Sequence, residues 1–128
     1  MNNKPRIILI VEDDLKTSKL YLHKLTSLGY EVIATPSGQQ GLVHAKEKRP
    51  SLIILDIMLP GKLNGFDVLE NLKSDADLKS IPVIILTNLD SEREVAMKIG
   101  AKDYFIKANT SFEDVVNRIN ELLGVKTK

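Results

Sequence analysis

The strongest constraint on the fold is a regular alternation of short apolar runs with longer amphipathic stretches. Five runs rich in aliphatic or aromatic residues recur along the chain, at 7–11, 31–35, 52–55, 83–86 and 104–106. The runs 7–11, 52–55 and 83–86 contain no alternating polar residues, which is typical of strands covered on both faces in a parallel sheet. The pattern therefore predicts five strand–helix units.

The intervening stretches carry the start and stop signals of helices. Ser37 and Thr110 are each followed three residues later by Gln or Glu, the spacing of a capping box. Gly100 and Gly124 stand where the fourth and fifth helices are expected to end. We expect four of the helices to bury apolar stripes made by Leu15, Leu22, Leu25, Phe66, Leu69, Leu72, Val95, Ile99, Val115, Ile119 and Leu122.

Five such units predict an α/β fold with a doubly wound, five-stranded parallel sheet. Right-handed crossovers and a strand order of 2-1-3-4-5 place the first and third strands side by side at the switch point, where ligands bind in such sheets. A chain of 128 residues fits one domain. We therefore expect a single domain over 1–128 with its core at about 6–123.

Composition excludes several classes of function. Subtracting 17 acidic from 18 basic residues leaves a net charge of +1, and the basic residues are scattered among acids, so we expect no direct nucleic-acid binding. The chain has no cysteine, which excludes disulfides and thiolate chemistry. Its apolar runs are far shorter than the roughly 20 residues of a membrane span. We expect a cytoplasmic protein without membrane contact.

Polar residues of different kinds follow the expected strands. Glu12 and Asp13 follow the first, Asp56 the third, Thr87 the fourth and Lys107 the fifth. Because the carboxyl ends of parallel strands share one edge, Asp13 and Asp56 should face each other at the switch point. Turns after strands often carry polar residues, but they do not need acids at two strand ends, a hydroxyl at a third and a lysine at a fourth. The set therefore indicates a functional site.

Facing carboxylates repel each other unless they share a proton or bind a hard cation, and oxygen ligands of this kind suit Mg²⁺. A lysine and a hydroxyl beside such an ion form a site for a phosphoryl group. Asp56 is the better candidate nucleophile than Asp13, because it stands alone at a central strand end. Asp14 is interpreted as the cap of the first helix.

These residues resemble the response-regulator receiver domains, the phosphoacceptor modules of two-component signalling, and within them the chemotaxis-regulator type. The similarity covers roughly residues 6–123. It rests on four motifs together: ILIVEDD at 8–14, LIILDIMLPG at 52–61, PVIILT at 82–87 and GAKDYFIK at 100–107.

The resemblance implies a flavodoxin-like fold and specific roles for the residues. It makes Asp56 the phosphoacceptor, and it implies a sensor histidine kinase or a histidine phosphotransfer protein as the donor. Output would run through another protein or through a homodimer, using the surface of helix 4, strand 5 and helix 5. The implied Mg²⁺ ligands are Glu12, Asp13, Asp56 and the Met58 backbone carbonyl, while Thr87 and Lys107 contact the phosphoryl oxygens and Thr87 and Tyr104 form the switch.

Three features depart from the family pattern. Ala108 follows Lys107 where the family usually has a proline with a cis bond, and a cis bond to Ala would cost roughly 3 kcal/mol, so we expect trans. Asn88 is larger than the usual residue after the threonine and could restrict access or bond to the phosphate. The segment 87–100 is shorter than usual, and 60–65 is longer by one residue.

Other functions remain open at this point. A degenerate receiver would act only as a docking module, without chemistry, if Asn88 and Ala108 disable the site. A metal-dependent phosphatase with an Asp nucleophile would need a second acid, and the Asp56 loop offers Met58 instead. A carrier of FMN or a nucleotide would need a phosphate-binding loop after the first strand, where this chain has acidic residues. We do not expect turnover of a diffusible substrate.

Overall fold

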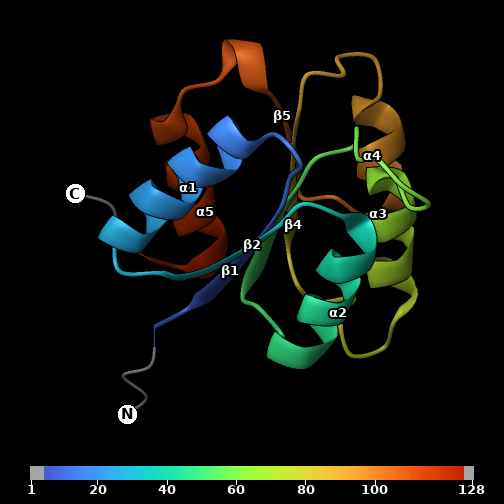
Figure 1. The fold of residues 1–128 in the computed structure, drawn as a ribbon, viewed down its shortest axis with the longest axis horizontal. Coiled ribbons are helices and arrows are strands. Elements are labelled where there is room, and N and C mark those ends of the chain that lie inside the picture. The colour runs from blue at the N-terminus through green and yellow to red at the C-terminus, as the bar shows by residue number, and fades with distance from the viewer. Residues whose placement is uncertain (1–4, 126–128) are drawn as a thin grey trace.

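Helices cover both faces of a parallel sheet whose order is β2-β1-β3-β4-β5, as predicted (Figure 1). The computed structural model describes residues 5–125, so the ends of the expected 1–128 domain lie outside the described residues. The strands are β1 (Ile7–Val11), β2 (Glu31–Thr35), β3 (Leu52–Leu55), β4 (Val83–Thr87) and β5 (Asp103–Ile106). The helices are α1 (Leu15–Ser27), α2 (Gly38–Lys48), α3 (Gly65–Ser74), α4 (Arg93–Ile99) and α5 (Phe112–Leu123), with a 3₁₀ turn η1 (Lys107–Asn109) after β5.

The sheet separates two apolar cores. Successive strand residues point to opposite faces, so Ile8 and Ile10 pack in one core and Leu9 and Val11 in the other. The first core is closed by α1 and α5, and the second by α2, α3 and α4 (Figure 1). Both faces of the central strands are thus buried, which explains their continuous apolar runs.

Two strands are one residue longer than predicted. β4 extends to Thr87 and β5 begins at Asp103. Thr87 pairs with Ile106 and is fully buried, so it is the last strand residue and does not follow the strand. The polar side chains of these two residues hid the strand ends in a prediction based on apolar runs.

The predicted buried faces of α1 and α4 are partly wrong. Leu25 is buried as predicted, but Leu15 and Leu22 are exposed, and α1 buries Ser18 and Tyr21 in their place. In α4 the buried residue is Ala96, whereas Val95 is exposed. The orientation of each helix on the sheet decides which of its faces is buried. In α1 and α4 that face carries small or aromatic residues, and the aliphatic residues of the neighbouring face stay exposed. The stripes of α3 and α5 are confirmed, with Leu69, Leu72, Val115 and Ile119 buried.

Most helix ends follow the sequence signals, and Asp14 stands at the N-cap position of α1 as predicted, although its side chain makes no hydrogen bond to a backbone N–H of the helix. Ser37 accepts a hydrogen bond from the Gln40 N–H, and Gly100 and Gly124 cap α4 and α5, as predicted. The cap of α5 is Ser111, which accepts from the Asp114 N–H, and not Thr110. The 3₁₀ turn after β5 delays the start of the helix by one residue.

Candidate functional site

Three carboxylates meet where β1 and β3 lie side by side. Val11 pairs with Leu55 at the ends of these strands, so the residues that follow, Glu12, Asp13 and Asp56, share one edge of the sheet. One carboxylate oxygen of each lies within 4.8 Å of the others. Glu12 and Asp56 are only 3% and 4% exposed, whereas Asp13 is exposed. The predicted acidic cluster is therefore present.

Lys107 reaches this cluster from the start of η1, directly after the edge strand β5. Its Nζ lies 2.6 Å from Glu12 Oε1 and 2.9 Å from Asp56 Oδ2. The ammonium is itself largely buried, with its side chain 16% exposed. One ammonium faces three carboxyl groups, so the acidic groups of the site outnumber its single cation.

Burial and pairing act in opposite directions on the ionisation of these groups. Burial raises the pKa of Glu12 to about 7, and the charge of Asp56 adds to this effect, against the opposing bonds from Lys107 and the Asp14 N–H. Burial also acts to raise the pKa of Asp56, but Thr87, Lys107 and the Met58 N–H outweigh it, so this pKa lies below its usual value. Asp56 is thus the carboxylate that this site keeps ionised.

The backbone after β3 fixes the Asp56 side chain. The Met58 N–H donates to Asp56 Oδ1 at 3.0 Å, and the Gly65 N–H donates to the Ile57 carbonyl at 2.9 Å. A Cβ at position 65 would lie 2.1 Å from the Asp56 carbonyl oxygen. The start of α3 can therefore pack against this backbone only because residue 65 is glycine. No pattern in the sequence marks Gly65, because the need for glycine there comes from a contact between segments that only the fold brings together.

The predicted switch residues, Thr87 and Tyr104, are both buried beside the β4–α4 connection. Thr87 Oγ1 accepts a hydrogen bond from the Leu89 N–H at 3.3 Å. The Tyr104 hydroxyl donates to the carbonyl of Leu89. Arg93 of α4 also donates to the Tyr104 carbonyl, at 2.8 Å. Thr87 and Tyr104 are thus linked through one loop residue.

The departures from the family pattern can be placed in the structure. The described residues contain no cis peptide bond, so the Lys107–Ala108 bond is trans, as predicted. The Asn88 side-chain oxygen accepts a hydrogen bond from the Ala108 N–H at 3.1 Å. This contact was not predicted, although the sequence shows a polar side chain at 88 and, because residue 108 is not proline, a backbone N–H at 108.

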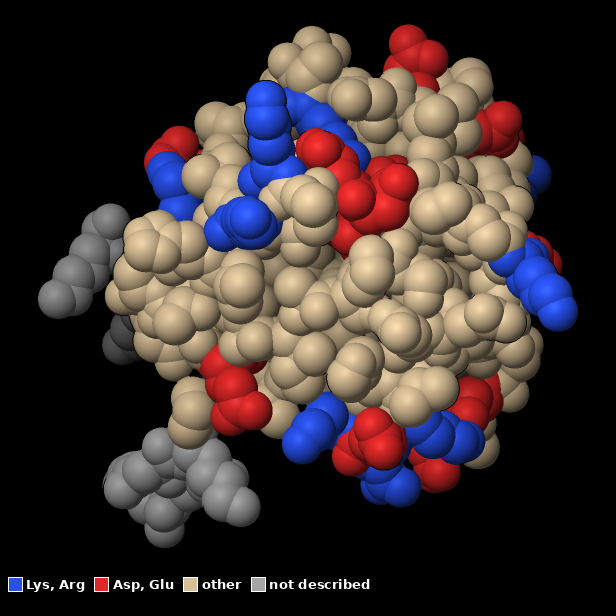
Figure 2. Space-filling model, viewed as in Figure 1, with Lys and Arg blue, Asp and Glu red and all other residues tan. Residues whose placement is uncertain are grey.

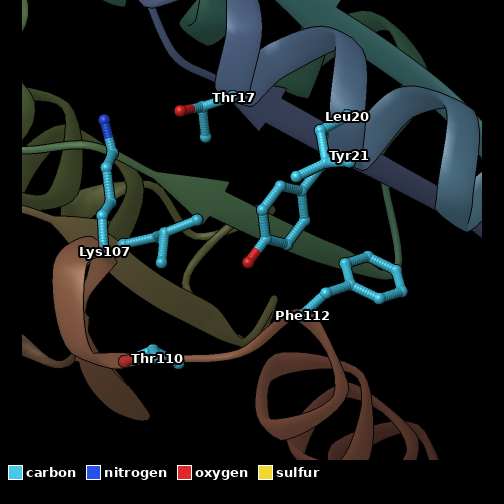
Figure 3. A pocket seen from close by; sticks show the side chains of 7 residues that line it. Thr17, Leu20, Tyr21, Lys107, Thr110 and Phe112 are labelled. Carbon is cyan, nitrogen blue, oxygen red and sulfur yellow. The ribbon is translucent and has the colours of Figure 1, made fainter.

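The Lys107 stem also lines a small pocket between α1 and the start of α5. Tyr21 and Phe112 meet edge to face there, with ring centroids 5.1 Å apart. In Figure 3 the two rings lie on one side of the pocket, and the Lys107 side chain runs along the other side.

On the face shown in Figure 2, basic side chains are scattered and stand beside acidic ones. Within residues 5–125, none of the helices is both long and apolar enough to span a bilayer.

Comparison with known proteins gives relatives of two lengths. Protein PilH of Pseudomonas aeruginosa is 35% identical over 123 residues, which cover 91% of this chain and 97% of PilH. The probable transcriptional regulator ycf27 of Porphyra purpurea is 37% identical over 109 residues, 84% of this chain but only 43% of that protein. The chain thus spans less than half the length of some relatives that it matches.

Solved structures agree with the fold and with the sequence relatives. A putative response regulator from Chloroflexus aurantiacus J-10-fl superposes with a TM-score of 0.86 at 29% identity, covering 94% of this chain and 99% of that one. The receiver domain of sensor histidine kinase PA1611 from Pseudomonas aeruginosa PAO1, which has a magnesium ion coordinated in its active-site cleft, gives a TM-score of 0.84 at 27% identity and covers 94% and 98%. The sequence model of the response regulator receiver domain matches residues 8–120, and the chain belongs to this family.

Proposed function

We propose that the chain accepts a phosphoryl group on Asp56 from a phosphohistidine donor, in the presence of Mg²⁺, and thereby changes its affinity for a partner. The observation that carries the proposal is the surroundings of Asp56. Its carboxylate is buried 2.9 Å from the Lys107 ammonium and lies within 4.8 Å of the oxygens of Glu12 and Asp13. This combination of a nucleophile, a cation and two further acids suits phosphoryl transfer.

The donor set fits a hard divalent cation. Its members are oxygen atoms only, and the acidic groups outnumber the single ammonium, which favours a cation. Glu12, Asp13, Asp56 and the Met58 carbonyl would hold Mg²⁺, which when bound supplies charge neutralisation and orientation for the phosphoryl oxygens. The magnesium ion in the PA1611 receiver domain supports this assignment.

Each of the chain's own residues has a distinct role in the proposed transfer. An Asp56 carboxylate oxygen forms the new bond to phosphorus as the P–N bond of the phosphohistidine breaks, and the electron pair of that bond stays with the imidazole. Lys107 neutralises charge on the transferred group, because its ammonium already lies at the acceptor carboxylate. The Thr87 hydroxyl donates to a phosphoryl oxygen when it turns from the loop.

The expected output runs from Thr87 through the β4–α4 connection to Tyr104. A phosphoryl group adds nearly two negative charges, enough to bias a packed element between two arrangements. If Thr87 Oγ1 gives up its hydrogen bond from the Leu89 N–H, Leu89 is no longer held by Thr87. Leu89 can then move together with Tyr104, whose hydroxyl bonds to the Leu89 carbonyl. We infer that the surface of α4, β5 and α5 then binds an output protein or a second copy of the chain.

The engaged lysine favours this function over phosphorylation-independent docking. Lys107 contacts two acids although Ala108 follows it, so the departure at 108 does not turn the lysine away from the site. No second acid lies in the Asp56 loop beside Met58, which leaves the phosphatase alternative without its proton donor. We expect a regulatory phosphoacceptor without turnover of a diffusible substrate.

The test is labelling by acetyl phosphate, followed by intact mass and peptide mapping. We compare the wild type, Asp56→Asn and the control Asp90→Asn, which removes an exposed carboxylate in the β4–α4 connection. The wild type and the control should gain one phosphoryl group with Mg²⁺ and none with EDTA, and Asp56→Asn should gain none. Undiminished labelling of Asp56→Asn would place the nucleophile elsewhere.

A further inference from the structure

A hydrogen bond joins two connections at the rim of the site. Asn88 follows β4, and Ala108 lies in η1, one residue after Lys107. The Asn88 Oδ1 accepts from the Ala108 N–H at 3.1 Å. The bond therefore links the β4–α4 connection to the segment that carries the site lysine.

This bond extends the pairing of β4 with β5 beyond the last strand pair. That last pair is Thr87 with Ile106, so the next residues along the two chains are Asn88 and Lys107. Here the backbone of β5 turns into η1, and its pairing with β4 stops. A side-chain oxygen takes the place of a strand carbonyl and bonds to Ala108 instead. The residues that follow β4 and β5 therefore stay aligned for one residue beyond the strands.

The bond also constrains the backbone at Lys107. The Ala108 N–H belongs to the same planar peptide group as the Lys107 carbonyl, so holding the N–H restricts rotation of that group relative to the Lys107 Cα. The first N–H groups of a short helix have no partner within it, and Ala108 lies in a turn of three residues. Without Asn88, this N–H would be left to water.

We propose that Asn88 is a positioning residue, which acts through the Ala108 N–H to hold Lys107 in the direction that meets the phosphoryl group on Asp56. This inference rests on the proposed function. It also accounts for two departures together: the resembled family usually has a proline at 108, which has no N–H to donate, and a small residue at 88. In this chain a side-chain acceptor and a backbone donor replace them as a pair.

The test is a double-mutant cycle with Asn88→Ala, Ala108→Pro and both together. Asn109→Ala is the control, because Asn109 is an exposed asparagine in the same turn. For each variant we titrate Mg²⁺ alone, then beryllium at saturating Mg²⁺ with excess fluoride, following ¹H–¹⁵N spectra. Exchange of the Ala108 amide with D₂O is measured without any ligand, so this readout does not depend on phosphoryl chemistry.

Three results are expected together. Asn88→Ala weakens beryllofluoride binding by roughly threefold to tenfold, as loss of one hydrogen bond implies, and leaves Mg²⁺ affinity unchanged, because Asn88 is not in the acidic cluster. The Ala108 amide exchanges faster in this variant, and Asn109→Ala behaves like the wild type. In the Ala108→Pro background, Asn88→Ala has no further effect on beryllofluoride binding.

The outcomes that overturn the inference are separable from failure of the proposed function. Unchanged exchange of the Ala108 amide in Asn88→Ala would remove the hydrogen bond from the account. An unchanged beryllofluoride affinity, or an equal loss of Mg²⁺ affinity, would reduce Asn88 to a structural residue. If the wild type itself binds no beryllofluoride with Mg²⁺, the proposed function falls, and the positioning role with it.

Discussion

Replacing Glu12 by glutamine isolates the cost of keeping a charged group in the site. Glu12 is 3% exposed and pairs with Lys107 at 2.6 Å. Burial raises its pKa to about 7, from 4.5 in the unfolded chain. The folded state therefore binds more protons than the unfolded state between these two values, so the free energy of unfolding of the wild type falls as pH rises through this range. Glutamine does not ionise, so the free energy of unfolding of Glu12→Gln does not fall in this way as pH rises.

The size of the effect follows from the two pKa values. The difference between about 7 and 4.5 corresponds to about 3 kcal/mol when the whole range is crossed. Between pH 5 and pH 8 the stability of Glu12→Gln relative to the wild type should therefore rise by roughly 2 to 3 kcal/mol in EDTA. Below pH 5 the two proteins converge, because the wild-type side chain is then neutral in the folded state.

Urea unfolding at pH 5 and pH 8 measures this directly, with Glu47→Gln as the control, since Glu47 is exposed on α2. Adding Mg²⁺ at pH 8 should stabilise the wild type by about 2.7 kcal/mol at 100 times its dissociation constant. At the same Mg²⁺ concentration the gain should be smaller in Glu12→Gln, which lacks one ligand. If the wild type and Glu12→Gln differ by the same amount at both pH values in EDTA, burial of the ionised Glu12 costs nothing and the electrostatic account of the site is wrong.

Three further predictions test separate parts of the structure. Gly65→Ala should lower the free energy of unfolding by roughly 1 to 3 kcal/mol, since its Cβ would lie 2.1 Å from the Asp56 carbonyl oxygen; an unchanged urea midpoint would contradict that close packing. Ser111→Ala should cost about 1 kcal/mol by removing the cap of α5, whereas Thr110→Ala should cost less in the same urea series, and the reverse order would show that the cap is misplaced. Thr87→Ala should still be phosphorylated by acetyl phosphate but show smaller amide shifts in the β4–α4 connection, and shifts as large as in the wild type would refute the coupling.

The fold could be predicted because its central strands are buried on both faces. Continuous apolar runs such as 52–55 indicate strands that are buried on both faces. The alternation of these strands with helices along the chain then predicts a doubly wound sheet. The same argument placed Glu12, Asp13 and Asp56 at one edge, where the structure brings them together. These features depend on order along the chain, which the sequence contains directly.

The errors concern features that depend on direction in space. Leu15 and Leu22 share one face of α1, but the sheet contacts a neighbouring face that carries Tyr21. A count of leucines cannot reveal that rotation, because Tyr21 and Ser18 look less apolar than the residues left in solvent. The α5 cap was misplaced for a related reason, since the 3₁₀ turn after β5 has no distinct sequence pattern.

Contacts between distant residues were the least accessible part of the site. The sequence placed Lys107 at the correct edge, but its simultaneous contact with Glu12 and Asp56 depends on how far its side chain reaches across the sheet. The bond from Ala108 to Asn88 joins residues twenty positions apart. Neither residue type is unusual alone, so only their juxtaposition in the fold gives them a role. The roles of Thr87 and Tyr104 remain predictions.

The most direct test of the central claim is a crystal structure of the chain grown with Mg²⁺ and beryllofluoride. The account predicts beryllium bonded to an Asp56 carboxylate oxygen, a fluoride in contact with the Lys107 ammonium, and one cation held by the cluster of Glu12, Asp13 and Asp56. A free Asp56 carboxylate at saturating ligand, or a cation and beryllofluoride bound away from this edge of the sheet, would contradict it.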